Sequence, residues 1–205
     1  MTQQNHWEKV YSSKPPEELG WYAPRLEISL AWITGLNLDL DSQIIDVGGG
    51  ASALVDDLLN LGYSSITVVD LSGKALVVAR QRLGTGAEKV IWLEGDITAV
   101  PLATSQYDVW HDRAVFHFLT TPRGRQHYQE VLVRALRPGG DLIMATFAPG
   151  APPQCSGLPV ERYSAEELSA TLGAEFQLQK QKRQLHITPG GVEQMYLYCH
   201  FRKSE

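Results

Sequence analysis

Short apolar runs alternate with amphipathic stretches along most of the chain. Residues 24–36 place Leu26, Leu30 and Ile33 at helical spacing and predict a first helix. Residues 43–47 form a β-branched run that ends in three glycines, which predicts a strand followed by a tight turn. Apolar residues over 54–59 then return to helical spacing. The segment therefore predicts a strand, a glycine turn and a helix.

The same alternation continues through the middle of the chain. Strands are predicted at 65–69, 89–93, 107–110 and 141–147, and helices at 72–83 and 121–136. Ser72 is a suitable helix N-cap, and Pro122 suits a first helical turn. Helical crossovers between successive strands predict a parallel sheet with helices on both faces. After a loop at 148–162, Ser164 and Glu167 form a capping box for one more helix.

The last part of the chain has a different pattern. Two strand-like runs, 176–187 and 192–201, are separated only by the sequence Thr188-Pro-Gly-Gly191. A connection this short permits only an antiparallel hairpin. We therefore predict a single α/β domain over residues 1–205 with a doubly wound, mostly parallel sheet and one antiparallel strand. Residues 1–36 form an N-terminal helical segment, and residues 37–205 form the core.

Composition narrows the classes of partner. The chain has 205 residues, 43% of them hydrophobic, and a formal net charge of −5, so no overall attraction to nucleic acid is expected. Its two cysteines, Cys155 and Cys199, are too few for a disulfide framework. Neither a signal-peptide-like start nor a run of roughly 18 apolar residues is present. We expect a cytoplasmic protein, a monomer or homodimer, with no metal, nucleic-acid or membrane partner.

The glycine turn is the first candidate site. Gly48, Gly49 and Gly50 follow a strand that contains Asp46, and glycines allow a ligand to approach the backbone closely. Asp70 ends the next strand, where a carboxylate can accept hydrogen bonds from two ribose hydroxyls. A plain tight turn and an aspartate placed at a helix N-terminus explain the same residues without a ligand. Both interpretations remain open at this point.

These residues, taken in order, resemble the motifs of class I S-adenosylmethionine (SAM)-dependent methyltransferases. Ile45, Asp46, Gly48 and Gly50 match the first motif, although Ser52 stands where a third glycine is usual. The segment 94–97, the pair at 112–113 and the turn at 137–140 resemble three later motifs. The resemblance implies a seven-stranded sheet of order 3-2-1-4-5-7-6 whose last strand is antiparallel, and SAM as the cofactor. The cofactor-binding residues it implies are Asp46, Gly48, Gly49, Gly50, Asp70, Leu71, Asp96, Ile97, Asp112 and Arg113.

Methyl transfer from a sulfonium requires alignment of the acceptor more than covalent help from the protein. A general base is needed only if the acceptor must lose a proton. His117 and His111 are the candidate bases, although a packing or capping role explains either one equally well. In similar small methyltransferases the N-terminal segment is a lid, so the resemblance implies that Tyr11, Trp21 and Tyr22 belong to the lid or the substrate site. Anchoring of a terminal segment to the core explains the same aromatic residues without a lid. Tyr163 is expected on the opposite side of the pocket.

The chain most resembles the small type-11/type-12 methyltransferase domain group. The predicted function is methyl transfer to a small molecule or a protein side chain, because motifs for nucleic-acid bases are lacking. An NAD-dependent oxidoreductase is the first alternative, but the glycine spacing is not Gly-x-Gly-x-x-Gly. A SAM-binding module without catalysis is the second alternative.

Overall fold

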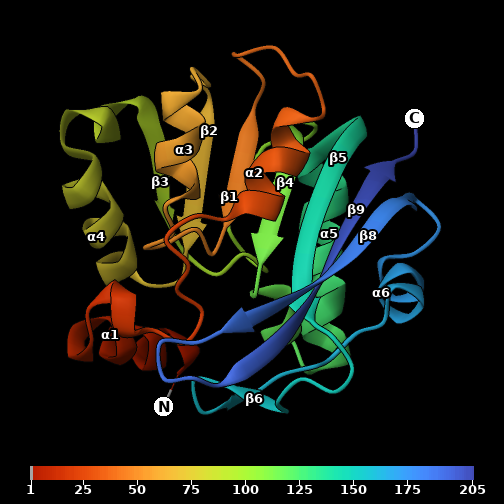
Figure 1. Ribbon diagram of the computed structural model, residues 1–205. Coiled ribbons are helices and arrows are strands. Elements are labelled where there is room, and N and C mark those ends of the chain that lie inside the picture. Colours follow the sequence, from red (N-terminus) through yellow and green to blue (C-terminus); the bar gives the residue numbers. More distant parts are fainter. Residues whose placement is uncertain (1) are drawn as a thin grey trace.

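The computed structural model describes residues 2–205 and contains one large sheet with helices on both faces (Figure 1). The strands of this sheet are β1 (Ile44–Val47), β2 (Ile66–Asp70), β3 (Val90–Glu94), β4 (Tyr107–Arg113), β5 (Leu136–Phe147), β8 (Phe176–Ile187) and β9 (Glu193–Lys203). The α-helices are α1 (Gln3–Ser13), α2 (Glu27–Thr34), α3 (Leu54–Asn60), α4 (Gly73–Leu83), α5 (Pro122–Ala135) and α6 (Ala165–Leu172). Short 3-10 turns are η1 (Pro16–Glu18), η2 (Gly84–Lys89) and η3 (Phe116–Phe118).

The strand order confirms the predicted topology. The seven strands lie in the order β3-β2-β1-β4-β5-β9-β8, and β9 is antiparallel to both of its neighbours. The predicted sixth and seventh strands of the sheet are labelled β8 and β9. The labels β6 (Gln154–Cys155) and β7 (Leu158–Pro159) belong to a small separate hairpin within the expected loop. The hairpin turn between β8 and β9 is closed by Thr188, whose N–H donates to the Val192 carbonyl at 2.9 Å.

Alternation of side chains along the central strands builds two cores. On one face Ile44, Ile66 and Val68 pack against α2, α3 and α4, and on the other Ile45, Val47 and Trp110 pack against α5 and α6. Both faces of β1 and β2 are fully buried, which explains their continuous apolar sequences.

Helix caps fix where several helices begin. The Ser72 side chain accepts a hydrogen bond from the Ala75 N–H at the start of α4, and Thr121 does the same for the Gly124 N–H at α5. Ser164 and Glu167 form the predicted capping box of α6. These caps lie close to the sequence-predicted boundaries.

Two local predictions need correction. The expected turn at 137–140 belongs to β5, where pairing with β4 is irregular between Tyr107 and Val109 and Gly139 has a φ of +67°. The extra residues therefore form a bulge that still needs a glycine. The helix predicted over residues 24–36 is α2, which begins at Glu27 rather than at residue 24, and α1 precedes it. No helix within residues 2–205 is long and apolar enough to cross a membrane.

Candidate active site

The glycine turn after β1 lies at the end of the sheet where the parallel strands terminate. Gly48 and Gly50 have positive φ values of +66° and +23°, a conformation that side chains disfavour. The Val115 side chain occupies the space that a β-carbon at Gly48 would need, and the Asp70 carboxylate lies in the same way against Gly50. Gly48 and Gly50 are therefore required by backbone conformation and by close packing.

A residue of α4 that the sequence did not identify stabilises this turn by hydrogen bonds to its backbone. Arg82, at the end of α4, donates hydrogen bonds to the carbonyls of Ala51 at 2.8 Å and Ser52 at 2.6 Å. The same guanidinium pairs with Asp56 of α3, with Nε at 3.0 Å from Oδ1. Its only sequence signal is a basic residue in the last turn of a helix, which is too common to be diagnostic.

Two acidic side chains flank the turn, and each keeps one carboxylate oxygen without a protein partner in residues 2–205. Asp46 Oδ1 lies 2.6 Å from His111 Nδ1, and its Oδ2 is buried without a hydrogen bond. Asp70 Oδ1 accepts from the Ser72 N–H at 2.8 Å. Burial raises the pKa of Asp70 to about 7, the charges of Asp46 and Glu8 add to this, and the Ser72 N–H opposes it. Both carboxylates are suited to a ligand that brings hydrogen-bond donors.

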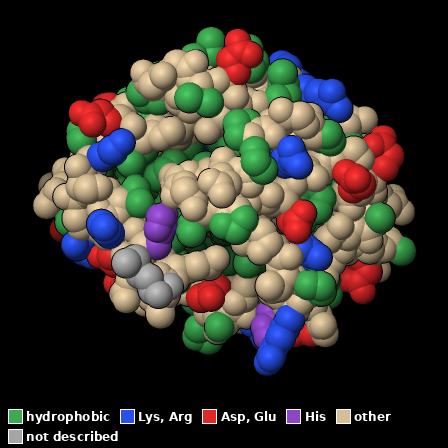
Figure 2. Space-filling view, turned by 90° about the horizontal axis from the view of Figure 1, so that it is seen from below, with side chains coloured by type: hydrophobic (Ala, Val, Ile, Leu, Met, Phe, Trp, Pro, Cys, Tyr) green, Lys and Arg blue, Asp and Glu red, His purple; other side chains and the backbone are tan. Residues whose placement is uncertain are grey.

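Two adjoining cavities lie above the turn and share Tyr11, Trp21, Val47, Gly48 and Arg113. Figure 2 views this end of the molecule and shows hydrophobic side chains at the floor of a hollow. Of the predicted cofactor residues, Asp70, Leu71, Asp96 and Ile97 line the first cavity, Asp46 and Gly49 line the second, and Gly48 and Arg113 line both. The structure thus brings together residues from β1, β2, β3 and β4 that are far apart in the sequence.

Helix α1 lies next to the start of α4 at the lower end of the sheet (Figure 1). Its residues Gln3, Trp7 and Tyr11 line the first cavity, and polar contacts attach it to the core. Glu8 Oε1 accepts from Ser72 Oγ at 2.8 Å and from the Lys74 N–H at 3.3 Å, both at the start of α4. Gln4 donates to Glu94 Oε1 at 3.2 Å. The sequence analysis missed Glu8 and Gln4, because the partners of a polar helix surface are set only by tertiary structure.

Aromatic side chains form the inner surface of this cover. Trp7 packs edge-on against Trp21 and Phe118, with ring centroids 5.4 and 5.1 Å apart. Tyr11 and Trp21 line both cavities, and Tyr22 lines the second. Their movement as a lid stays a prediction.

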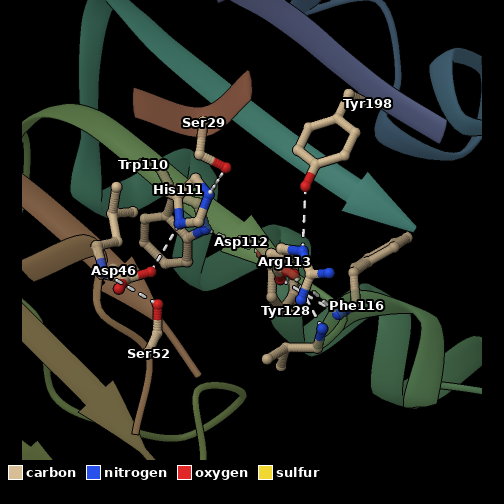
Figure 3. A network of polar contacts seen from close by, with 12 residues as sticks. Ser29, Asp46, Ser52, Trp110, His111, Asp112, Arg113, Phe116, Tyr128 and Tyr198 are labelled. Carbon is tan, nitrogen blue, oxygen red and sulfur yellow. Dashed lines mark hydrogen bonds and ion pairs between the residues drawn. The ribbon is translucent and has the colours of Figure 1, made fainter. Parts of the chain in front are cut away.

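The two candidate bases lie in different environments. His111 lines the second cavity, but Nδ1 is 2.6 Å from Asp46 and Nε2 is 2.8 Å from Ser29 Oγ, so both ring nitrogens are engaged (Figure 3). His117 lines neither cavity, and its Nδ1 accepts from the Phe147 N–H at 3.3 Å. Burial, aided by the charge of Arg113, lowers the pKa of His117 to about 3. This geometry argues against either histidine as a general base.

Two further expectations are corrected by the structure. Asp112 lines neither cavity; its carboxylate accepts from the Val115 N–H at 3.0 Å and from Tyr128 Oη at 2.6 Å, which makes it an internal cap (Figure 3). Burial, the largest influence, raises its pKa to about 6. Tyr163 also lies away from the cavities and packs on Phe116 in the core, while Cys155 of the same loop lines the first cavity.

Arg113 ends β4 and points toward β9 rather than toward β1 (Figure 3). Its Nε donates to Tyr198 Oη at 3.0 Å, its Nη1 donates to the Trp21 carbonyl at 3.0 Å, and its guanidinium carbon lies 4.4 Å from the ring centre of Tyr196. The guanidinium thus lies beside aromatic rings, between the strand ends and the covering segment.

The family model described as "Methyltransferase domain" matches residues 44–140. Among curated relatives, the chain is 32% identical over 109 residues to the ubiquinone/menaquinone biosynthesis C-methyltransferase UbiE of Roseobacter denitrificans, covering 52% of this chain and 42% of that protein. It is 22% identical over 150 residues to the eEF1A lysine and N-terminal methyltransferase of Bos taurus, covering 70% of this chain and 21% of that protein. The chain therefore spans less than half the length of these two relatives.

Solved structures give the same fold. The N-methyltransferase NodS from Bradyrhizobium japonicum, in complex with S-adenosylhomocysteine (SAH), aligns over 100% of both chains with a TM-score of 0.75 and 17% identity. A SAM-dependent methyltransferase from Anabaena variabilis aligns over 99% of this chain and 96% of its own, with a TM-score of 0.73 and 15% identity. Together, the family match and the fold confirm the resemblance to class I SAM-dependent methyltransferases.

Proposed function

We propose that this protein transfers a methyl group from SAM to an acceptor molecule. The main support is the pair of carboxylates of Asp46 and Asp70, at the ends of neighbouring strands. Each has one oxygen without a protein hydrogen bond in residues 2–205, and both lie beside a turn that requires glycine. The family match over residues 44–140 supports this chemistry rather than hydride transfer with NAD. Bound SAM supplies a methyl group on a positively charged sulfur.

Residues of the two cavities suit the amino-acid, ribose and adenine portions of this cofactor. The orphaned Oδ2 of Asp46 suits the ammonium of the methionine portion, and the outer oxygen of Asp70 suits the ribose hydroxyls. Leu71, Asp96 and Ile97 line the same cavity beyond Asp70 and would hold the adenine. His111 links Asp46 to Ser29 of α2, so it acts as a positioning residue for the acid.

The protein contributes mainly orientation and exclusion of water. Trp7, Trp21 and Phe118 form an aromatic wall beside the glycine turn, and α1 closes the side next to α4. Holding two reactants in line inside such a site is worth roughly 7–11 kcal/mol of the barrier. With His111 fully engaged and His117 away from the cavity, the proposal includes no histidine base.

The aromatic lining of the first cavity, from Trp7, Trp21 and Phe118, favours a small-molecule acceptor over a protein side chain. The names of the relatives indicate different methyl acceptors. One is a C-methyltransferase of ubiquinone/menaquinone biosynthesis, one is a lysine and N-terminal methyltransferase of eEF1A, and one is a malonyl-[acyl-carrier protein] O-methyltransferase. The acceptor class must therefore be inferred from the side chains of this chain.

Calorimetric titration of the purified protein with SAM, SAH and NAD tests the cofactor. Binding of SAM and SAH in the micromolar range, with no heat from NAD, is the expected result. Release of SAH from SAM in the presence of an acceptor distinguishes an enzyme from a binding module. Binding of NAD alone would refute the proposal.

A further inference from the structure

Arg113 has an unusual electrostatic position. Its side chain lines both cavities, yet it forms no ion pair within 4.0 Å with any carboxylate in residues 2–205. Its two hydrogen bonds go to neutral groups, the hydroxyl of Tyr198 and the carbonyl of Trp21, and its guanidinium carbon lies 4.4 Å from the ring centre of Tyr196. Arg113 is half-buried, so its guanidinium has lost part of its contact with water without gaining a counter-ion, and a cation–π contact offsets only part of that cost.

The hydrogen bonds of Arg113 leave part of the guanidinium available. Nε and Nη1 each donate to a protein oxygen, whereas Nη2 has no hydrogen-bond partner in the described chain. Two bonds from different directions fix the plane of the group, so its remaining N–H groups are presented in a fixed orientation. A fixed guanidinium fork matches the two oxygens of a carboxylate.

The side chains of Arg113 and His111 extend in different directions from β4. Asp46, which suits the methionine ammonium, lies on β1, and His111 extends from β4 toward it. Arg113, two residues further along β4, extends the opposite way, toward Tyr198 on β9 (Figure 3). The first cavity, which Arg113 lines, is also lined by Trp21, Phe118 and Cys155.

We propose that Arg113 is the anchor for a carboxylate of the methyl acceptor, and that the acceptor is a flat, largely apolar carboxylic acid. This inference rests on the proposed function, because it assigns the acceptor half of the same site. The aromatic wall accommodates the apolar body, and the guanidinium holds the charged end. Cys155 is a neutral wall residue here, since burial raises its pKa to about 11 although the charge of Arg113 opposes this.

The test uses benzoate and its neutral isostere benzamide as probes of the protein saturated with SAH. Ligand-observed NMR or calorimetry should show benzoate binding at least about tenfold more tightly than benzamide, because a hydrogen-bonded charge pair adds roughly 1.5–3 kcal/mol. Arg113→Met should remove this preference, and Arg113→Lys should restore part of it, since lysine keeps the charge but not the fork. Arg134→Met, at an exposed position on α5, is the matched control and should keep the preference.

A second arm identifies the source of the carboxylate. SAH carries the carboxylate of its homocysteine portion, which corresponds to that of the methionine portion of SAM, whereas 5′-methylthioadenosine lacks the amino-acid portion. Arg113→Met should change the affinity for both nucleosides by less than about threefold. A tenfold loss for SAH with no loss for methylthioadenosine would assign the carboxylate to the cofactor and overturn the inference.

The remaining outcomes are equally decisive. Equal binding of benzoate and benzamide to the unmodified protein would also overturn the inference, and this comparison needs no variant to fold. Failure of the unmodified protein to bind SAH would refute the proposed function, and this inference with it. Normal SAH binding without benzoate preference would refute the inference alone.

Discussion

Replacing Asp70 by asparagine should stabilise the ligand-free protein while weakening cofactor binding. The side chain is only 9% exposed, and its pKa is raised from an ordinary value of 3.8 to about 7. One pKa unit corresponds to ~1.4 kcal/mol, so the interval corresponds to at most about 4 kcal/mol of destabilisation when the carboxylate is ionised. Asparagine keeps an oxygen that accepts from the Ser72 N–H and removes the charge.

The sign of the pH dependence follows from the raised pKa. A group whose folded pKa exceeds its unfolded value contributes stability below the unfolded pKa, and this is lost as pH rises through the folded pKa. The difference in unfolding free energy between Asp70→Asn and the unmodified protein should therefore be near zero at pH 4 and grow up to about pH 8. Asp112, whose pKa is raised to about 6, titrates in both proteins, so its contribution cancels in this comparison.

Urea unfolding without ligand, at several values between pH 4 and pH 8, measures this difference. Asp41→Asn, at an exposed position, is the control and should show no pH-dependent gain. In calorimetry, Asp70→Asn should bind SAH about 10- to 100-fold more weakly at pH 8, because charge-assisted bonds to the ribose are lost. A stability difference that does not change with pH would refute the argument from burial, and unchanged SAH affinity would refute the ribose role.

Three other substitutions test the site and its supports. Gly48→Val should abolish SAH binding while circular dichroism remains that of a folded protein, because the backbone at this position has a positive φ that valine disfavours and the new side chain meets Val115. Retained binding would contradict the close approach of the ligand to this turn. Tyr128→Phe removes the donor to the buried carboxylate of Asp112 and should lower the free energy of unfolding by about 1–3 kcal/mol in urea titrations, whereas a neutral effect would mean that the carboxylate finds another partner. Glu8→Ala removes the contacts of α1 with the start of α4 and should speed SAH dissociation in stopped-flow experiments about three- to tenfold, and an unchanged rate would show that α1 does not limit release.

The local sequence determined the order and type of the main elements. The β-branched runs at β1 and β2, the caps at Ser72 and Ser164 and the Thr188–Gly191 turn act over a few residues, so their signals are readable without the fold. The glycine turn and the two acids at strand ends were identifiable for the same reason. Each is set by backbone conformation or by its position relative to one strand.

Only the tertiary structure decided which polar side chains meet. His111 was a plausible base in the sequence, but folding places Asp46 and Ser29, 65 and 82 residues away, against its two ring nitrogens. Asp112 was predicted as a site residue, but in the fold its carboxylate accepts a hydrogen bond from Tyr128. The orientation of Arg113 is set by its hydrogen bond to Tyr198, 85 residues later in the sequence. Long-range packing sets the environment that a strand side chain faces. The reason is that burying a polar group without a hydrogen-bond partner costs more free energy than local conformational preferences contribute.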